Sequence, residues 1–163
     1  MQLIFLVESD KKSQSDYNYI KATIDHYYYI LGVKLTPIFL GSKGNYNKKE
    51  AEIKRNINKY SKESIVFICY DIDNINNPSY QMNEQIISYA NNKGYEVIWF
   101  YEDIEQVYIK QQIPNSEKTK RAIKFISHKE IKSINEIDLI QKEVLKKNSS
   151  NILFALDKYL KRK

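Results

Sequence analysis

Three short runs of apolar, β-branched and aromatic residues constrain the fold of this chain more than any other feature. They cover residues 3–7, 65–70 and 97–101. Because polar and apolar residues do not alternate within them, we expect parallel strands that helices cover on both faces. A fourth run, over residues 33–40, contains Pro37, which cannot donate a ladder hydrogen bond. We therefore expect this strand to lie at an edge of the sheet or to end early.

Apolar residues with helical spacing separate the four runs. Their recurrence every three or four positions predicts amphipathic helices. The predicted helices cover residues 17–31, 53–60 and 78–93. Gly32 and Gly94 follow the first and third helices, as glycine commonly does at helix ends, and Pro78 marks the start of the third. The buried stripe expected for the third helix is Met82, Ile86, Ile87 and Ala90.

Strands that alternate with helices of this length predict right-handed crossovers and an open sheet. The expected fold class is α/β, with a three-layer, Rossmann-like, mostly parallel sheet of four strands. After Tyr101 we expect short helical segments, including residues 137–145 and 152–160. Ser149 or Ser150 is expected to cap the turn between these two helices.

This pattern predicts one domain without an internal boundary. It spans residues 1–163, with an α/β core over residues 1–110 and a helical C-terminal extension over residues 111–163. A chain of this length leaves little room for a second hydrophobic core.

Composition and charge limit the partners and the compartment. The chain carries a formal net charge of +6, so we expect attraction to phosphate-rich partners such as nucleic acid. Cys69 is the single cysteine, which excludes an internal disulfide, and the two histidines are too far from it in sequence for a zinc motif. The apolar start of the chain lacks a basic lead and meets Glu8 directly, and no apolar stretch approaches the roughly 18 residues of a membrane helix. We expect a soluble, cytoplasmic protein.

Acidic residues close two of the predicted strands. Glu8 ends the first strand, and Asp71 and Asp73 end the third. Side chains two positions apart on an extended segment point the same way, so Asp71 and Asp73 can converge on one cation. Glu8 joins them if the first and third strands are neighbours, and hard oxygen ligands of this kind suit Mg²⁺ or Mn²⁺. The simpler interpretation is that these acids form turns or cap helices.

These strand ends resemble the TOPRIM family. The segments LIFLVE at residues 3–8 and IVFICYDID at residues 65–73 are similar to its first-strand glutamate and third-strand D-x-D. The resemblance covers residues 1–110 and is closest to the small RloB and AbiL proteins of abortive infection, in which a helix like that at residues 104–109 follows the fourth strand. Ser9 follows Glu8 where the family usually has glycine.

The resemblance implies metal-dependent phosphodiester cleavage of DNA or RNA, with a role in phage defence. Asp71 and Asp73 would hold Mg²⁺ or Mn²⁺, and Glu8 would act as a general acid or base or as a further ligand. Glu105 is a weaker catalytic candidate, for which a solvated helix acid is the simpler interpretation. An ATPase partner protein is implied as well, because defence proteins of this type are often encoded beside one.

The densest useful basic cluster follows the fourth predicted strand. It consists of Lys118, Lys120, Arg121 and Lys124. The spacing places some of these side chains on one helix face, where they could follow a nucleic-acid backbone. A solvated helix face is the more common meaning of such a run.

Two other functions stay open. A receiver-like signalling domain would use Glu8, Asp10 and Asp71 in the same architecture, although no fifth strand ending in lysine and no hydroxyl residue closing the fourth strand are expected after Tyr101. The other is a non-catalytic TOPRIM-like subunit that binds nucleic acid or a partner protein.

Overall fold

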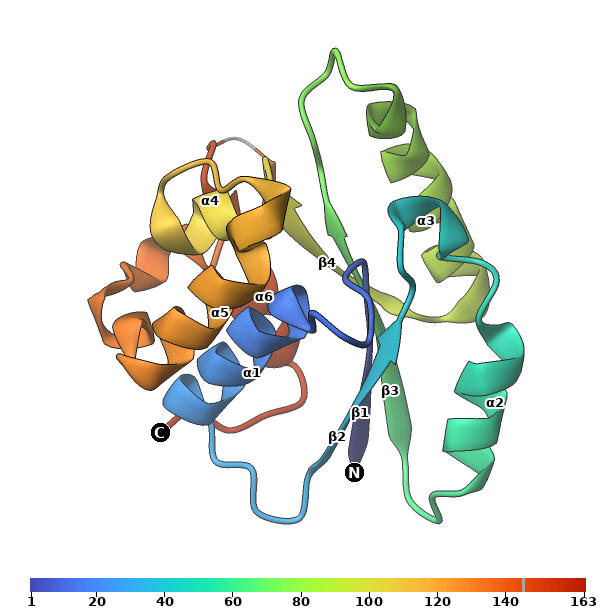
Figure 1. Cartoon of the computed structure of the whole chain (residues 1–163). Coiled ribbons are helices and arrows are strands. Elements are labelled where there is room, and N and C mark those ends of the chain that lie inside the picture. Colours follow the sequence, from blue (N-terminus) through green and yellow to red (C-terminus); the bar gives the residue numbers. More distant parts are fainter. Residues whose placement is uncertain (145) are drawn as a thin grey trace.

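A five-stranded sheet forms the centre of the molecule (Figure 1). The computed structural model describes residues 1–144 and 146–163. The strands are β1 (Gln2–Val7), β2 (Lys34–Phe39), β3 (Ser64–Asp71), β4 (Glu96–Tyr101) and β5 (Ser149–Ser150). They lie in the order β2-β1-β3-β4-β5; the first four are parallel, and β5 is antiparallel to β4. The fold is α/β with a mostly parallel sheet, as the sequence predicts.

Strand β1 lies between β2 and β3 and is buried along its whole length. Leu3 pairs with Leu35 of β2 on one side and with Ile65 of β3 on the other. The first and third strands are therefore neighbours, which is the condition for Glu8 to join the acids at the end of β3. Strand β2 is at the edge of the sheet, as expected from Pro37.

The prediction of four strands is wrong by one short strand. Ser149 and Ser150 form β5 against the end of β4 and do not form a turn between two helices. The side chain of Asn151 extends this pairing, because the Trp99 amide donates to Asn151 Oδ1 at 2.9 Å and Asn151 Nδ2 donates to the Val97 carbonyl oxygen at 3.0 Å. Polar residues complete this edge of the sheet, so no apolar run in the sequence indicates the strand β5.

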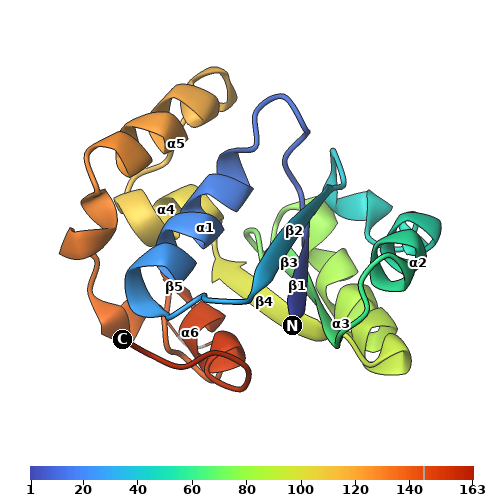
Figure 2. The ribbon, with the colours of Figure 1, turned by 90° about the horizontal axis from the view of Figure 1, so that it is seen from below.

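Helices cover both faces of the sheet (Figures 1 and 2). One face carries α1 (Ser15–Tyr27), α4 (Ile104–Ile109), α5 (Lys118–Ser127) and α6 (Ile152–Leu156), and the other carries α2 (Glu50–Asn58) and α3 (Met82–Lys93). Successive side chains of a strand point to opposite faces. Accordingly, Leu3, Phe5 and Val7 join the buried cluster under α1, whereas Ile4 and Leu6 join the cluster under α2 and α3. Two hydrophobic cores therefore hold the three layers together.

Helix α1 is shorter than the sequence predicts. It ends at Tyr27, and Tyr28 is extended. Tyr28 forms a bridge with Arg162, and the Lys163 amide donates to the Tyr27 carbonyl oxygen at 2.9 Å. Pairing with the far end of the chain thus replaces the last turn of the predicted helix. Gly32 turns the chain back with a φ of 75°.

Helix α3 confirms most of its predicted pattern. Ile86 and Ala90 are buried, and Gly94 ends the helix with a φ of 69°. The prediction for Ile87 is wrong, because 40% of this residue is exposed. A short 3-10 turn, η2 (Pro78–Gln81), precedes the helix.

The C-terminal third is less helical than the sequence predicts. Between α5 and β5 it contains two 3-10 turns, η4 (Glu130–Ser133) and η5 (Glu136–Asp138), and α6 ends at Leu156. The helix predicted over residues 137–145 is wrong for residues 137–144, and residue 145 lies outside the described residues. In the described part of the chain, no helix has the length and apolarity needed to cross a membrane.

Candidate functional site

Four acids line one cleft at the carboxyl end of the sheet: Glu8, Asp16 and Asp71 from three elements, and the exposed Asp10 from the loop between β1 and α1. The Asp10 carboxylate accepts hydrogen bonds from the Lys12 and Ser13 amides of its own loop. Glu8 directly follows β1, Asp71 is the last residue of β3, and Asp16 lies in the first turn of α1. The strand order reverses between β1 and β3, and ligands of open α/β sheets bind beyond the carboxyl ends of the strands at such a point. The cleft has a volume of about 590 Å³.

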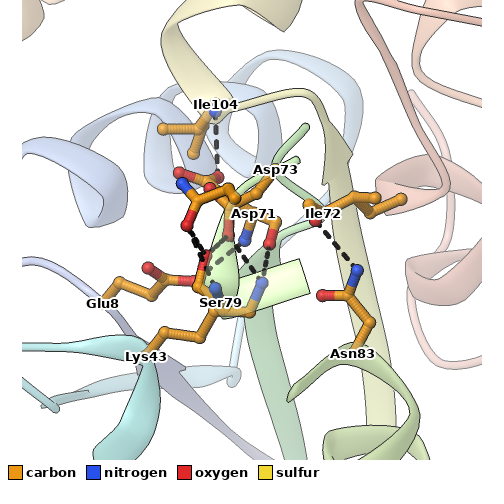
Figure 3. Close-up of polar contacts among 9 residues, drawn as sticks. Glu8, Lys43, Asp71, Ile72, Asp73, Ser79, Asn83 and Ile104 are labelled. Atoms are coloured by element: carbon orange, nitrogen blue, oxygen red, sulfur yellow. Dashed lines mark hydrogen bonds and ion pairs between the residues drawn. The ribbon is translucent and has the colours of Figure 1, made fainter. Parts of the chain in front are cut away.

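Main-chain hydrogen bonds hold the Glu8 and Asp71 carboxylates in place (Figure 3). The Asp71 amide donates to Glu8 Oε1 at 2.9 Å, and the Ile104 amide, at the start of α4, donates to Asp71 Oδ1 at 3.0 Å. Among the described residues, no hydrogen bond reaches the second oxygen of either carboxylate. Each carboxylate is therefore fixed through one oxygen and has the other available to a ligand.

Asp16 is brought to the same place by the loop that joins β1 to α1. The Ser9 amide donates to Asp16 Oδ2 at 2.8 Å, and Ser15 Oγ donates to Asp16 Oδ1 at 3.1 Å. Glu8, Asp16 and Asp71 together also surround a small buried space beneath the cleft. Sequence analysis missed Asp16 as a site residue, because its distance along the chain from Glu8 does not show that the loop folds back.

Glu8, Asp16 and Asp71 are half-buried, and their carboxyl groups lie close enough to affect one another's charge. Burial raises the pKa of Glu8 to about 8; the hydrogen bond from the Asp71 amide opposes this shift, and repulsion from Asp16 adds to it. Burial, followed by repulsion from Glu8 and Asp16, raises the pKa of Asp71. Burial is also the main cause that raises the pKa of Asp16. Lys43 lowers the pKa of Glu8 and Lys118 lowers that of Asp16, but neither lysine outweighs burial, so the cleft disfavours negative charge.

Asp73 lies next to these acids, but its carboxylate has other partners. Lys43 Nζ donates to Asp73 Oδ2 at 2.8 Å, and Ser79 Oγ donates to the same oxygen at 2.6 Å (Figure 3). Asp73 has a φ of 65°, so the chain has left the extended conformation and alternate side chains no longer share a direction. The structure brings Glu8 and Asp71 together, as the sequence predicts, and directs Asp73 to Lys43.

The basic cluster predicted on α5 is divided between the interior and the surface. Lys118 lines the cleft, where its Nζ pairs with Glu105 Oε2 at 2.9 Å. Arg121 pairs with Glu130 at 2.5 Å. These two cations therefore neutralise protein carboxylates.

Lys120 and Lys124 are exposed on the outer side of α5. The simpler interpretation of Glu105, a solvated helix acid, is wrong, because this residue is fully buried. Burial raises the pKa of Glu105, and Lys118 opposes the shift. Among the described residues, Glu105 Oε1 has no hydrogen-bond partner.

The chemistry of the cleft fits a hard divalent cation. In the described part of the chain, no three histidine, cysteine, aspartate or glutamate side chains are already arranged as a metal site. Glu8, Asp16 and Asp71 nevertheless offer only carboxylate oxygens, the donors that Mg²⁺ and Mn²⁺ prefer. Burial raises the pKa values of all three groups, and repulsion adds to it at Glu8 and Asp71, so a cation between them would favour their charged forms.

Comparisons of the chain with known protein families, with curated proteins and with solved structures give no match. The fold and the geometry of the cleft therefore carry the functional argument.

Proposed function

We propose that this protein is a TOPRIM-like phosphoryl-transfer enzyme that cleaves phosphodiester bonds of nucleic acid with a divalent cation. One observation carries the proposal: three carboxylates from β1, α1 and β3 line a single cleft where the strand order of the sheet reverses. Acids that only form turns or cap helices have no reason to converge from three elements on one cleft that disfavours negative charge.

Glu8, Asp16 and Asp71 would hold the cation. When bound, Mg²⁺ or Mn²⁺ polarises the scissile phosphate and neutralises the negative charge that develops on its oxygens. The Asp71 amide and the Ile104 amide fix the Glu8 and Asp71 carboxylates, so these groups are oriented before substrate arrives.

Other side chains of the cleft suit a phosphodiester substrate. Without a cation, burial raises the pKa of Glu8 to about 8. A cation bound directly to Glu8 would lower this pKa, so Glu8 acts as a general acid or base only where Asp16 and Asp71 hold the ion. Lys118 lines the cleft, where its ammonium group, although paired with Glu105, would also attract a phosphate oxygen. Ser13, Ser42 and Thr119 add hydroxyl groups to the lining of the cleft.

A cleavage assay tests this function. End-labelled single-stranded and double-stranded DNA and RNA are incubated with the protein in Mg²⁺, in Mn²⁺ and in EDTA. We expect cation-dependent products from the wild type and none from Asp71→Asn. Asp138→Asn is the matched control, because Asp138 is bound by Lys110 and Lys146 away from the cleft. A wild type that cleaves none of these substrates, or an undiminished Asp71→Asn variant, contradicts the proposal.

The alternative of a receiver-like domain gains no support from the geometry. In residues 1–144 and 146–163, the only strand beyond β4 is the antiparallel pair Ser149 and Ser150, and neither residue is a lysine. Phage defence, an ATPase partner and a non-catalytic binding role rest on the resemblance alone and stay predictions.

A further inference from the structure

Lys43 is a buried cation at the edge of the acidic cleft. It begins the 3-10 turn η1 (Lys43–Asn45), which follows β2, and only 6% of the residue is exposed. Its Nζ lies 5.6 Å from the centre of the Tyr70 ring, which shields it from solvent on one side. A lysine this buried needs acceptors for its ammonium protons.

The acceptors of Lys43 lie at the end of β3. Lys43 Nζ donates to the Asp71 carbonyl oxygen at 2.5 Å and to Asp73 Oδ2 at 2.8 Å (Figure 3). Lys43 follows β2, its acceptors lie at the end of β3, and β1 lies between these two strands. The Lys43 side chain therefore crosses the end of β1, which Glu8 directly follows. The ammonium group is therefore held by one carboxylate and one carbonyl oxygen beside the acids of the cleft.

We infer that the Lys43 ammonium group takes the place of a second cation at this site, so that Asp73 is not a metal ligand and the cleft binds one divalent ion. This inference rests on the proposed function and specifies its metal stoichiometry. The only ion pair of Asp73 within the described residues is with Lys43, and Ser79 donates to the same carboxylate oxygen. A divalent ion on Asp73 would have to displace the ammonium group or lie against it, and like charges at this distance repel strongly in a poorly solvated site.

The second role of Lys43 in this arrangement is to position Asp71. Its bond to the Asp71 carbonyl oxygen and the bond of the Asp71 amide to Glu8 hold the same residue from both sides. Asp71 can therefore present its carboxylate to one ion without help from Asp73.

Calorimetric titration of the full chain with Mn²⁺ tests the inference. We expect the wild type to bind one ion, and Asp71→Asn to lose it. We expect Asp73→Asn to keep the ion. Its affinity for Mn²⁺ should change by less than about tenfold, the smallest cost that is common when a residue supporting a metal ligand is lost. Lys43→Met frees Asp73 and removes a positive charge, so we expect a second Mn²⁺ to bind. Lys48→Met, an exposed lysine of the same loop, is the charge-matched control and keeps one ion.

The possible failures are distinguishable. If Asp73→Asn weakens Mn²⁺ binding as much as Asp71→Asn does, or if the wild type binds two ions, the inference is wrong while the proposed function stands. If the wild type binds no Mn²⁺, both are wrong. Should Lys43→Met fail to fold, as circular dichroism would show, the comparison of Asp73→Asn with Asp71→Asn decides the question alone.

Discussion

The carboxylates at the carboxyl end of the sheet and those of the C-terminal third differ in their partners. Asp138 binds Lys110 at 2.8 Å and Lys146 at 2.5 Å, and Asp157 binds Arg162 through both of its oxygens. Burial alone would raise the pKa of Asp138, but hydrogen bonds from the two lysines outweigh it and lower the pKa. Arg162 outweighs burial at Asp157 in the same way.

In the cleft, by contrast, burial raises the pKa values of Glu8, Asp16 and Asp71, and repulsion from neighbouring acids adds to the shift at Glu8 and Asp71. This difference separates the acids that stabilise the fold from the acids that a bound cation would stabilise. Carboxylates in a direct ion pair with a lysine or arginine contribute to folding, whereas buried carboxylates gathered without such a pair are destabilising until a cation binds.

The largest expected effect is on cleavage. Glu8→Gln keeps the acceptor for the Asp71 amide but removes the titrating group, so the cleavage rate should fall by about 100-fold or more, the usual contribution of a general acid or base. Asp157→Asn removes an acid of the paired group and should leave the rate unchanged. Single-turnover kinetics of both variants measure this. Equal losses would mean that the two groups of acids do not differ in function.

The next effect is on stability, where the two groups should respond with opposite signs. Asp138→Asn leaves two lysines without their shared carboxylate and should lower the free energy of unfolding by about 1–2 kcal/mol. Asp71→Asn relieves repulsion and, without metal, should leave the free energy of unfolding unchanged or raise it. Urea denaturation in EDTA compares the two variants. A clear loss of stability in Asp71→Asn would assign this acid to the structural group.

The pH dependence of stability should also separate the two groups. The pKa of Glu8 rises from 4.5 in the unfolded chain to about 8 in the folded protein, so between these values the folded state binds more protons. The free energy of unfolding should therefore fall as the pH rises from 5 to 8. The paired acids Asp138 and Asp157 affect stability at lower pH. Their pKa values are lowered in the folded protein, so their contribution to the free energy of unfolding is lost on acidification.

Melting temperatures in EDTA across this range measure the effect, and Glu8→Gln should flatten it. A melting temperature that rises steadily from pH 5 to 8, or one that Glu8→Gln does not change, would contradict the assignment of the raised pKa to Glu8.

The smallest expected effect concerns the lysines of α5. Lys120 and Lys124 are exposed, and no ion pair joins either to an acid in the described part of the chain. If both contact phosphates, the double alanine variant should reduce the slope of log affinity against log salt by about 1–2. Lys158→Ala, which removes a lysine paired with Glu96, is the control and should leave the slope unchanged. Fluorescence anisotropy with labelled oligonucleotides at several salt concentrations measures the slopes, and an unchanged double variant would remove α5 from the nucleic-acid interface.

Local patterns in the sequence predict the parallel sheet and the meeting of Glu8 with Asp71. Both follow from buried strands, whose apolar residues and ends are visible in a short window. The same window does not show Asn151 completing the edge of β4, or Lys163 replacing the last turn of α1. These contacts join residues far apart in the chain and depend on single polar groups.

The site residues also differ in how well local sequence patterns predict them. The prediction for Asp73 assumed that the strand continues, whereas its positive φ turns the residue towards Lys43 and Ser79. Lys43 and Asp16 lie in or after irregular loops, where no periodicity places a side chain. Their partners become visible only when the fold brings the ends of β1, β2 and β3 together.

The most direct test of the central claim is an anomalous difference map from a crystal soaked in Mn²⁺. The account predicts one strong peak in the cleft, within bonding distance of carboxylate oxygens of Glu8 and Asp71 and close to Asp16, with the Lys43 ammonium group still on Asp73. A map without a peak in the cleft, at a Mn²⁺ concentration that occupies other carboxylates of the protein, would contradict the claim that these acids form a cation site.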